Sequence, residues 1–175
     1  MVQPWSKQQQ RVLREMNSIL HPPSVDERAA MLALNNEFAV ETSFLSLASM
    51  QELIASSFYV RVAGKTEAFC IALDQSAQYE NPNFSWFLQR YRRFVYIDRV
   101  VVATQARGQG IARKMYNDLK MAAKNADHTV LCCEVNVDPP NVASDRFHEA
   151  FGFEEVGQAF LAERTKTVRY LSLSF

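Results

Sequence analysis

The sequence lacks several features that large classes of protein depend on. Its 19 Lys and Arg residues equal its 19 Asp and Glu residues, so no net charge attracts nucleic acid or an anionic membrane. The three cysteines do not form a disulfide framework, which favours a reducing compartment. No apolar run approaches the ~20 residues of a membrane span, and no internal repeat is present. We therefore expect a cytoplasmic protein without nucleic-acid or membrane partners.

The length of the chain is that of one domain. Its 175 residues, 48% of them hydrophobic, supply enough apolar material for one core. Apolar residues recur at helical spacing within residues 7–20, and the pattern stops before Pro22, since a residue preceding proline avoids helical geometry. We expect residues 1–23 to be a helical extension and residues 24–175 to be the domain. A transit peptide is the alternative for the extension, although the acidic Glu15 argues against it.

The first half of the domain is expected to hold two helices and a hairpin. Ser24 has the position of an N-cap, and Glu27 would complete a capping box. The helix that follows carries Ala29, Leu32 and Ala33 on one face. The next expected elements are a helix over 47–56, a hairpin with strands at 57–63 and 67–73, and a long polar connection over 74–90.

A unit of strand, helix and strand dominates the second half. The segment 94–102 is almost continuously apolar, as expected for a central strand covered on both faces. A helix over 110–125 and a strand over 129–136 follow, which predicts a parallel pairing. The last expected elements are a helix capped by Asn141 and ended by Gly152, and a hairpin of strands 153–163 and 166–175. Together these elements predict an α/β fold with a mixed sheet flanked by helices.

The segment TQARGQGIARKMY, residues 104–116, lies where the central strand gives way to a helix. Glycines let the backbone approach a ligand closely, and amides at a helix N-terminus attract an anion, so this turn predicts phosphate binding. It is not a P-loop, because no Gly-Lys-Ser/Thr follows a glycine at the required spacing. A dinucleotide site fits poorly too, since the third glycine position holds Arg113 and the acidic Asp127 precedes the next strand.

Two motifs make the chain resemble the GNAT family of N-acetyltransferases. Residues 105–110, Gln-Ala-Arg-Gly-Gln-Gly, match that family's Gln/Arg-x-x-Gly-x-Gly/Ala motif. Residues 141–153 are similar to its Asn-x-x-Ala/Ser-x-x-Phe-Tyr-x-x-x-Gly-Phe segment. Leu34-Asn35-Asn36 and Asp138–Asn141 resemble a small, poorly characterised bacterial-type group within the family. The resemblance covers about residues 24–175 and implies a single-domain fold whose two central parallel strands splay apart.

The resemblance also implies a coenzyme site. In this family an amine attacks the thioester of acetyl-CoA directly, so the protein must position both substrates and move protons. By resemblance, the strand at 100–102 binds the pantetheine arm, the turn at 107–112 holds the pyrophosphate, and two asparagines flank the gap between the splayed strands. The coenzyme-binding residues implied in this way are Val100, Val101, Val102, Gln105, Arg107, Gly108, Gln109, Gly110, Ile111, Ala112, Asn136, Asn141, Ser144 and Phe147. No metal ion is implied.

His148 is where the chain departs from the family pattern. The family usually has a tyrosine at this position, and that tyrosine protonates the departing thiolate. An imidazole with a pKa near 6.5 can donate a proton as imidazolium or act as a base when neutral. We therefore take His148 as a candidate catalytic residue that looks into the cleft. The alternative is a half-exposed helix histidine close to Asp145.

The second candidate catalytic residue is Asp98, which stands alone in an apolar strand with the alternation of Val100 and Val102. It would face the cleft and relay the proton of the amine through water. An ion pair with a neighbouring arginine is the alternative. Glu134, on the adjacent strand, is a rival for the base.

Other polar and aromatic residues have two interpretations each. Glu37 and Glu41 would either attract an ammonium group or form a solvated helix end. The adjacent Cys132 and Cys133 favour buried core positions over catalysis, because no base is evident beside them. A further group of aromatic residues would either cover the acceptor site or simply pack the long connection: Trp86, Phe87 and Tyr91.

These observations predict an acetyltransferase that moves an acetyl group from acetyl-CoA to a primary amine of a small molecule, amino acid or peptide. The alternative is a non-catalytic acyl-CoA-binding or sensing module, which would keep the glycine turn and tolerate the loss of the tyrosine. A nucleotide oxidoreductase is a third reading, and it would bind NAD. The oligomeric expectation is a monomer or a homodimer.

Overall fold

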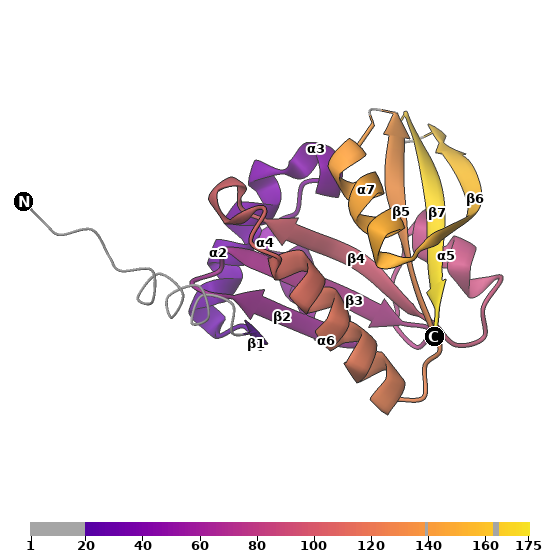
Figure 1. Cartoon of the computed structure of the whole chain (residues 1–175). Helices are drawn as coiled ribbons and strands as arrows, with labels where there is room; N and C mark the ends of the chain where they lie inside the picture. The colour runs from indigo at the N-terminus through magenta and orange to yellow at the C-terminus, as the bar shows by residue number, and fades with distance from the viewer. Residues whose placement is uncertain (1–19, 139, 163–164) are drawn as a thin grey trace, which may run out of the picture.

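Seven strands form one mixed sheet in the order β1-β2-β3-β4-β5-β7-β6 (Figure 1). The computed structural model describes residues 20–138, 140–162 and 165–175. The strands are β1 (Leu20–His21), β2 (Tyr59–Ala63), β3 (Ala68–Asp74), β4 (Val95–Val102), β5 (Val130–Asp138), β6 (Glu154–Leu161) and β7 (Lys166–Ser174). The two hairpins expected from the sequence, β2-β3 and β6-β7, are both present and antiparallel. The sequence therefore predicted six of these seven strands, all except β1.

Helices flank the sheet. They are α2 (Val25–Glu37), α3 (Ala39–Thr42), α4 (Leu47–Ser56), α5 (Pro82–Leu88), α6 (Ile111–Asn125) and α7 (Val142–Phe151), with a 3-10 turn η1 at Thr104–Ala106. In Figure 1, α6 crosses in front of β2, β3 and β4, and α7 lies in front of β5. Helix α4 packs on β3 and on α2. No described helix is both long and apolar enough to cross a membrane.

The capping box of α2 is confirmed, but of its expected apolar face only Leu32 packs against the core. The hydroxyl of Ser24 accepts from the amide of Glu27, and the Glu27 carboxylate accepts from the amide of Ser24. The buried side chains are Met31, Leu34 and Asn35, whereas Ala29 and Ala33 are exposed. Turning Met31 and Leu34 inward removes more apolar area from water than burying two alanines would, so the larger side chains decide the face. The cap residues Ser24 and Glu27 determine where the helix begins, but not which of its faces is buried.

The connection over 74–90 contains a helix that the sequence analysis did not predict. Asn81 caps α5 by accepting from the amides of Asn83 and Phe84, and Pro82 occupies the first turn, where its missing N–H costs nothing. Phe84 and Phe87 are fully buried. An Asn-Pro pair that suggested a loop is here the start of a short helix, stabilised by these two aromatic rings.

The two parallel strands splay apart, as the resemblance implied. Strands β4 and β5 pair only at Val95 with Leu131 and at Tyr96 with Cys132. Beyond that point β4 keeps its antiparallel partner β3, with a β-bulge where Arg99 pairs Ile71 while Ile97 pairs Ala72. The bulge leaves Asp98 as the extra residue and bends the strand. A gap between β4 and β5 results, and its walls are backbone and side chains of these two strands.

The short strand β1 corrects one detail of the expected N-terminal extension. Leu20 pairs with Ala63, and His21 with Val62, so both residues belong to the edge of the sheet. Leu20 is therefore not the last residue of a helix. The rest of the helix expected over 7–20 lies outside the described residues.

Candidate active site

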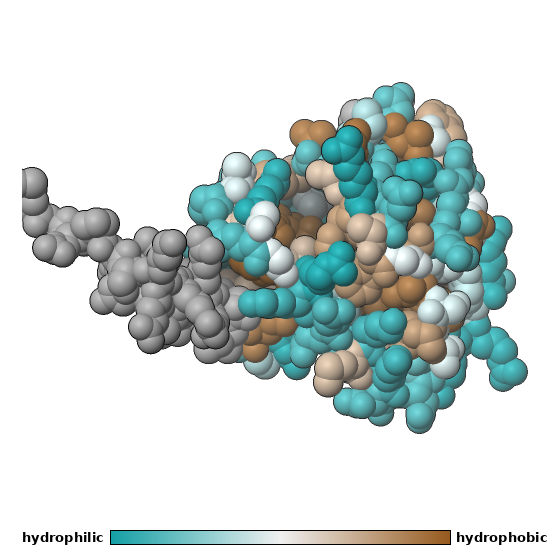
Figure 2. Space-filling model, in the orientation of Figure 1, coloured by the Kyte–Doolittle hydropathy of each residue, from teal (hydrophilic) through white to brown (hydrophobic). Residues whose placement is uncertain are grey.

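Two cavities meet where the central strands separate. The larger, of about 460 Å³, lies between the end of β4, the glycine turn and α7. The smaller, of about 110 Å³, lies deeper between β4 and β5 and reaches the first residue of β7. Figure 2 shows a hollow in the surface between α3, the glycine turn and α7. Six residues line both cavities, namely Glu41, Thr42, Val100, Asn141, Ser144 and His148.

The glycine turn needs glycine for its backbone conformation. Gly108 and Gly110 have φ angles of 75° and 77°, in the left-handed region that other residues disfavour. A Cβ at either position would meet no atom within 4 Å, so conformation rather than space demands the glycines. Gly110 is the N-cap of α6 and no side chain caps this helix, so its first amides remain available to an anion.

Most residues predicted to hold the coenzyme line the larger cavity. Those that do are Val100, Val101, Val102, Arg107, Gly108, Gly110, Ile111, Ala112, Asn141, Ser144 and Phe147. Gln105, Gln109 and Asn136 do not line the larger cavity. Asn136 lines the smaller cavity instead, and the side-chain amide of Gln109 donates to the backbone carbonyl of Gln105 at 3.1 Å. Arg107 is exposed; its Nε donates to the Val102 carbonyl at 3.1 Å, and its guanidinium stands over the Phe38 ring.

His148 is 3% exposed, so the half-exposed alternative is wrong. Its Nδ1 lies 2.8 Å from the Ser144 carbonyl oxygen, which can only accept, so Nδ1 carries a proton. Its Nε2 then accepts from the hydroxyl of Tyr116 at 2.9 Å. Burial lowers the pKa of His148, and the Ser144 carbonyl and Asp145 oppose this shift. His148 is therefore held neutral, which argues against an imidazolium acid.

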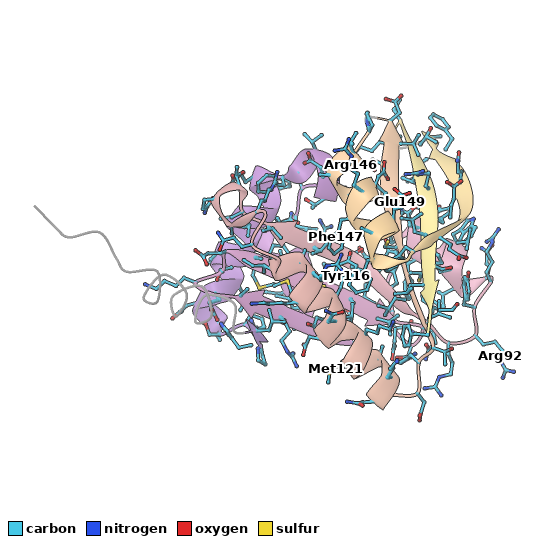
Figure 3. All side chains as sticks on the ribbon, viewed as in Figure 1. Arg92, Tyr116, Met121, Arg146, Phe147 and Glu149 are labelled. Atoms are coloured by element: carbon cyan, nitrogen blue, oxygen red, sulfur yellow. The ribbon has the colours of Figure 1, made fainter. Side chains whose placement is uncertain are left out.

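Tyr116 is a site residue that the sequence analysis missed. It is fully buried on α6 and lines the smaller cavity. Figure 3 shows Tyr116 and Phe147 where α6 and α7 face each other, and their rings meet edge to face with centroids 4.9 Å apart. Burial raises the pKa of the Tyr116 hydroxyl well above its usual value, so it remains protonated. Its position in the second turn of α6 gave no signal beyond that of a core aromatic.

Glu134 is a buried carboxyl group on the wall of the smaller cavity. The Tyr96 hydroxyl donates to its Oε2 at 2.7 Å, and the Asn83 side-chain amide donates to its Oε1 at 2.9 Å. Burial, with a smaller contribution from the nearby charge of Asp98, raises the pKa of Glu134 to about 7, against the two hydrogen bonds. A carboxyl group that titrates near neutrality is suited to accept a proton at physiological pH.

Asp98 forms the ion pair that the sequence left open as its alternative role. Its Oδ2 lies 3.1 Å from Nε of Arg99, and the Tyr79 hydroxyl donates to its Oδ1 at 2.8 Å. Arg99 also donates to the side chain of Asn35 and to the carbonyl oxygens of Thr42 and Ser43. Asp98 lines the smaller cavity, and its carboxylate is ion-paired with the neighbouring Arg99 guanidinium. Asn35, from the Leu-Asn-Asn segment, thus helps to fix the connection after α2.

The remaining acidic, cysteine and aromatic candidates differ in whether they line a cavity or are packed elsewhere. Glu41 lines both cavities, whereas Glu37 is exposed and lines neither. Cys132 and Cys133 are buried, and burial raises the pKa of both thiols, so neither is a thiolate at neutral pH. The aromatic residues of α5 pack the connection: Phe87 is buried and Trp86 stacks on Tyr170 with ring centroids 4.1 Å apart. They line neither cavity.

Comparison with known proteins identifies the class to which this fold and site belong. Residues 49–153 match the model of the acetyltransferase (GNAT) family. The chain therefore belongs to the GNAT acetyltransferase family. No curated protein matches it in sequence.

Solved structures share the fold at low sequence identity. The ribosomal-protein-alanine N-acetyltransferase from Brucella melitensis is 21% identical, with a TM-score of 0.67, and the match covers 90% of this chain and 99% of that one. The yncA protein of Salmonella typhimurium, solved with its cofactor acetyl-CoA, is 18% identical with a TM-score of 0.65, covering 89% and 92%. A chain of the NatC complex bound to Gag peptide and CoA is 16% identical with a TM-score of 0.68, covering 90% and 98%. This chain is similar to them in fold.

Proposed function

We propose that the protein transfers an acetyl group from acetyl-CoA to a primary amine of a small molecule, amino acid or peptide. The observation that carries this proposal is the junction of the two cavities. The larger is bordered by a turn suited to a phosphate group, the smaller by an ionisable carboxyl group, and Val100, Ser144 and His148 line both. A thioester at this junction would meet an amine that enters from the smaller cavity.

The residues around the larger cavity fit a coenzyme A ligand. The uncapped start of α6 offers amides to a pyrophosphate, and Arg107 adds a cation. Among the described strands, β4 has no partner on the β5 side from Ile97 to Val102. Apart from the Val102 carbonyl, which accepts from Arg107, its outward backbone groups can therefore bind the amide groups of a pantetheine arm. The same edge supplies an amide, that of Val102 in our assignment, to stabilise the oxyanion of the thioester.

Glu134 is our candidate for the general base. An amine must lose a proton to attack, and Glu134 titrates near neutrality beside the cavity that would hold the amine. In the reaction the amine nitrogen forms a bond to the carbonyl carbon, the carbon–sulfur bond breaks, and the thiolate leaves. Asp98, with its ion pair to Arg99, then acts on the electrostatics of Glu134 and is not itself the base.

Tyr116 and His148 are the groups that would serve the departing thiolate. Because Nε2 of His148 has no proton to give, the Tyr116 hydroxyl is the better proton source. A thiolate of pKa about 8.5, that of a free cysteine, leaves without an obligatory acid, so this help is moderate.

One experiment tests the function directly. The purified protein is incubated with acetyl-CoA and a panel of amines, amino acids and peptides, and free thiol is followed with a thiol reagent. Amine-dependent release of thiol supports the proposal. Calorimetric binding of CoA without steady thiol release would instead support the non-catalytic acyl-CoA-binding or sensing module, and affinity for NAD would support an oxidoreductase.

A further inference from the structure

The short helix α5 delivers a polar side chain to the smaller cavity. Asn83 lies in the first turn of α5 and is 1% exposed, although it belongs to a connection between two strands. The Asn81 cap fixes the start of the helix and therefore the direction of Asn83. A buried asparagine that lines a cavity has a specific set of partners to satisfy.

The partners of Asn83 determine which way its amide points. Its nitrogen lies 2.9 Å from Oε1 of Glu134, and its oxygen accepts from the hydroxyl of Tyr170 at 3.0 Å. A carboxylate only accepts and a tyrosine hydroxyl donates here, so the amide nitrogen faces Glu134. Tyr170 is itself held by Trp86, which stacks on its ring. A chain of contacts thus runs from α5 and β7 to Glu134.

Each oxygen of Glu134 receives one donor. Asn83 serves Oε1, and the Tyr96 hydroxyl serves Oε2 at 2.7 Å. We call these two donors the Glu134 clasp. Both come from positions outside β5, the strand that carries Glu134, so they fix the carboxylate plane relative to the sheet. The remaining lone pairs stay available to a proton that arrives through the cavity.

We propose that Asn83 is a positioning residue for the general base, which it holds in one orientation and keeps ionisable inside the protein. This inference rests on the proposed function, because it gives Glu134 a proton to accept. Without a donor, a buried carboxyl group strongly favours its neutral form and cannot act as a base. Asn83 is one of the two side-chain donors that stabilise the charged form of Glu134.

The other groups around Glu134 oppose or leave unchanged its ionisation. The charge of Asp98 disfavours the carboxylate form of Glu134, and Arg99 forms its ion pair with Asp98. The titratable groups that face Glu134 from the packed elements, or flank it on β5, are Tyr96 and Asp98 on β4, Tyr170 on β7, Tyr116 on α6, and Cys132 and Cys133 on β5. All of these except Asp98 are neutral at pH 7, because burial raises the pKa of each. The two donors of the clasp therefore favour the carboxylate.

The test is the titration of Glu134 itself, measured with and without Asn83. The carboxyl carbons of glutamate are labelled with ¹³C, and the Glu134 signal is assigned by its loss in Glu134→Gln. Asn83→Leu keeps the volume and removes the donor, so we expect the midpoint to move up by about one pH unit, the worth of a hydrogen bond to a charged group. The acid limb of kcat/KM for the amine should move up by the same amount, while KM for acetyl-CoA stays unchanged.

Three further variants make the outcome decisive. Tyr96→Phe removes the other donor and should move the midpoint in the same direction, which keeps the test available if Asn83→Leu does not fold. Tyr170→Phe removes only the lock on Asn83 and should give a smaller shift. Leu88→Ala changes an exposed side chain, 43% accessible, on the same helix and should leave both the midpoint and the pH profile unchanged.

An unmoved midpoint in Asn83→Leu and Tyr96→Phe, with activity lowered equally at every pH, would overturn the proposal and leave Asn83 as an anchor of α5. A different result would count against the proposed function alone. If no amine is acetylated by the wild-type protein, acetyl transfer fails as the function. The NMR midpoint then still decides whether the clasp controls the ionisation of Glu134.

Discussion

The hydroxyl of Tyr116 donates to Nε2 of His148 at 2.9 Å, which joins α6 to α7 in the wall of the smaller cavity. The tyrosine that the second motif of the family usually carries on α7 is absent from this chain. The hydroxyl of Tyr116 on α6 nevertheless reaches the side chain of His148, which occupies that position of α7. In our proposal the two groups therefore have different tasks: the Tyr116 hydroxyl, protonated at rest, is the proton source, and the neutral imidazole of His148 orients it.

This pairing predicts the effects of single and double substitutions. Tyr116→Phe and His148→Ala should each lower kcat by ~10–100-fold, the lower part of the range for acid–base catalysis. The double variant should be little worse than either, because the two groups act as one unit. The measurement is kcat at saturating acetyl-CoA. Tyr59→Phe is the control, since Tyr59 is also buried and donates to Asp118 away from both cavities.

The pH profile separates the orienting role from an imidazolium acid. His148 is held neutral, so wild-type kcat should not fall as pH rises from 6 to 8. His148→Tyr should restore part of the loss seen in His148→Ala, because it returns a hydroxyl to this helix. A wild-type kcat that declines through the pKa of an imidazole would contradict the neutral assignment.

Burial of neutral histidines also predicts a loss of stability in acid. The folded-state pKa of His148 is lowered from its ordinary value of 6.5, so the unfolded chain binds a proton that the folded chain resists. The contribution of each such histidine to the free energy of unfolding should therefore fall as pH drops below about 6.5, by at most about 1.4 kcal/mol per pH unit. The raised pKa of Glu134 contributes with the opposite sign below about pH 7, so the histidine contribution is measured as the difference between the wild type and a histidine variant. His128, whose pKa burial also lowers, adds to this slope.

Urea unfolding between pH 5 and pH 8 checks this expectation. His148→Asn should flatten the dependence in part and leave the contribution of His128. Comparing slopes rather than absolute values removes the loss of packing that the substitution causes at every pH. An unchanged slope in the variant would mean that His148 is protonated in the folded protein.

The glycine turn predicts a loss of coenzyme affinity. Arg107→Glu and Gly108→Val should each weaken acetyl-CoA binding by at least ~1.5–3 kcal/mol, the first through a lost charge-assisted hydrogen bond. The second acts through the positive φ of Gly108 and through a side chain placed where a phosphate would lie. Arg146→Glu, at an exposed position of α7 that lines neither cavity, is the charge control. Equal calorimetric affinity in both turn variants would rule out a pyrophosphate site there.

Local signals in the sequence predicted the parts of the site that depend on local structure. Ser24 with Glu27, Asn141 with its helix, and Gly152 at φ 101° each act within four residues, and all three are where they were expected. The glycine turn belongs to the same class, because its two left-handed glycines form a signal that can be read directly from six residues.

Contacts between distant segments could not be predicted in this way. Asn83 and Glu134 are 51 positions apart, and Tyr116 and His148 are 32 apart. Alternation predicted that Asp98 faces the cleft, and Asp98 does line the smaller cavity, but so do its neighbours Ile97 and Arg99. The pattern carried no information on the ion pair between Asp98 and Arg99. The choice between Asp98 and Glu134 as base therefore required the three-dimensional arrangement, in which one carboxylate is paired and the other is clasped by two neutral donors.

The proximity of Asp98 to Glu134 determines the direction in which the pKa of Glu134 should change when Asp98 is substituted. Asp98 raises the pKa of Glu134 by repulsion, so Asp98→Asn should lower that pKa and move the acid limb of kcat/KM to lower pH. If Asp98 were the base, the same substitution would abolish the limb together with most of the activity. Glu134→Gln should lower kcat by ~100-fold or more, within the range for loss of a general base.

Stability and activity must be measured on the same variants. Asp98→Asn leaves the buried Arg99 guanidinium without its ion-pair partner and should destabilise the fold, so kcat/KM is determined at a temperature where unfolding is negligible. Glu149→Gln removes an exposed carboxylate from α7, which Figure 3 labels, and should leave the profile in place. Removing the Asp98 charge removes a Coulomb repulsion that raises the pKa of Glu134, so an acid limb that stays fixed in Asp98→Asn would mean that the limb does not report the titration of Glu134.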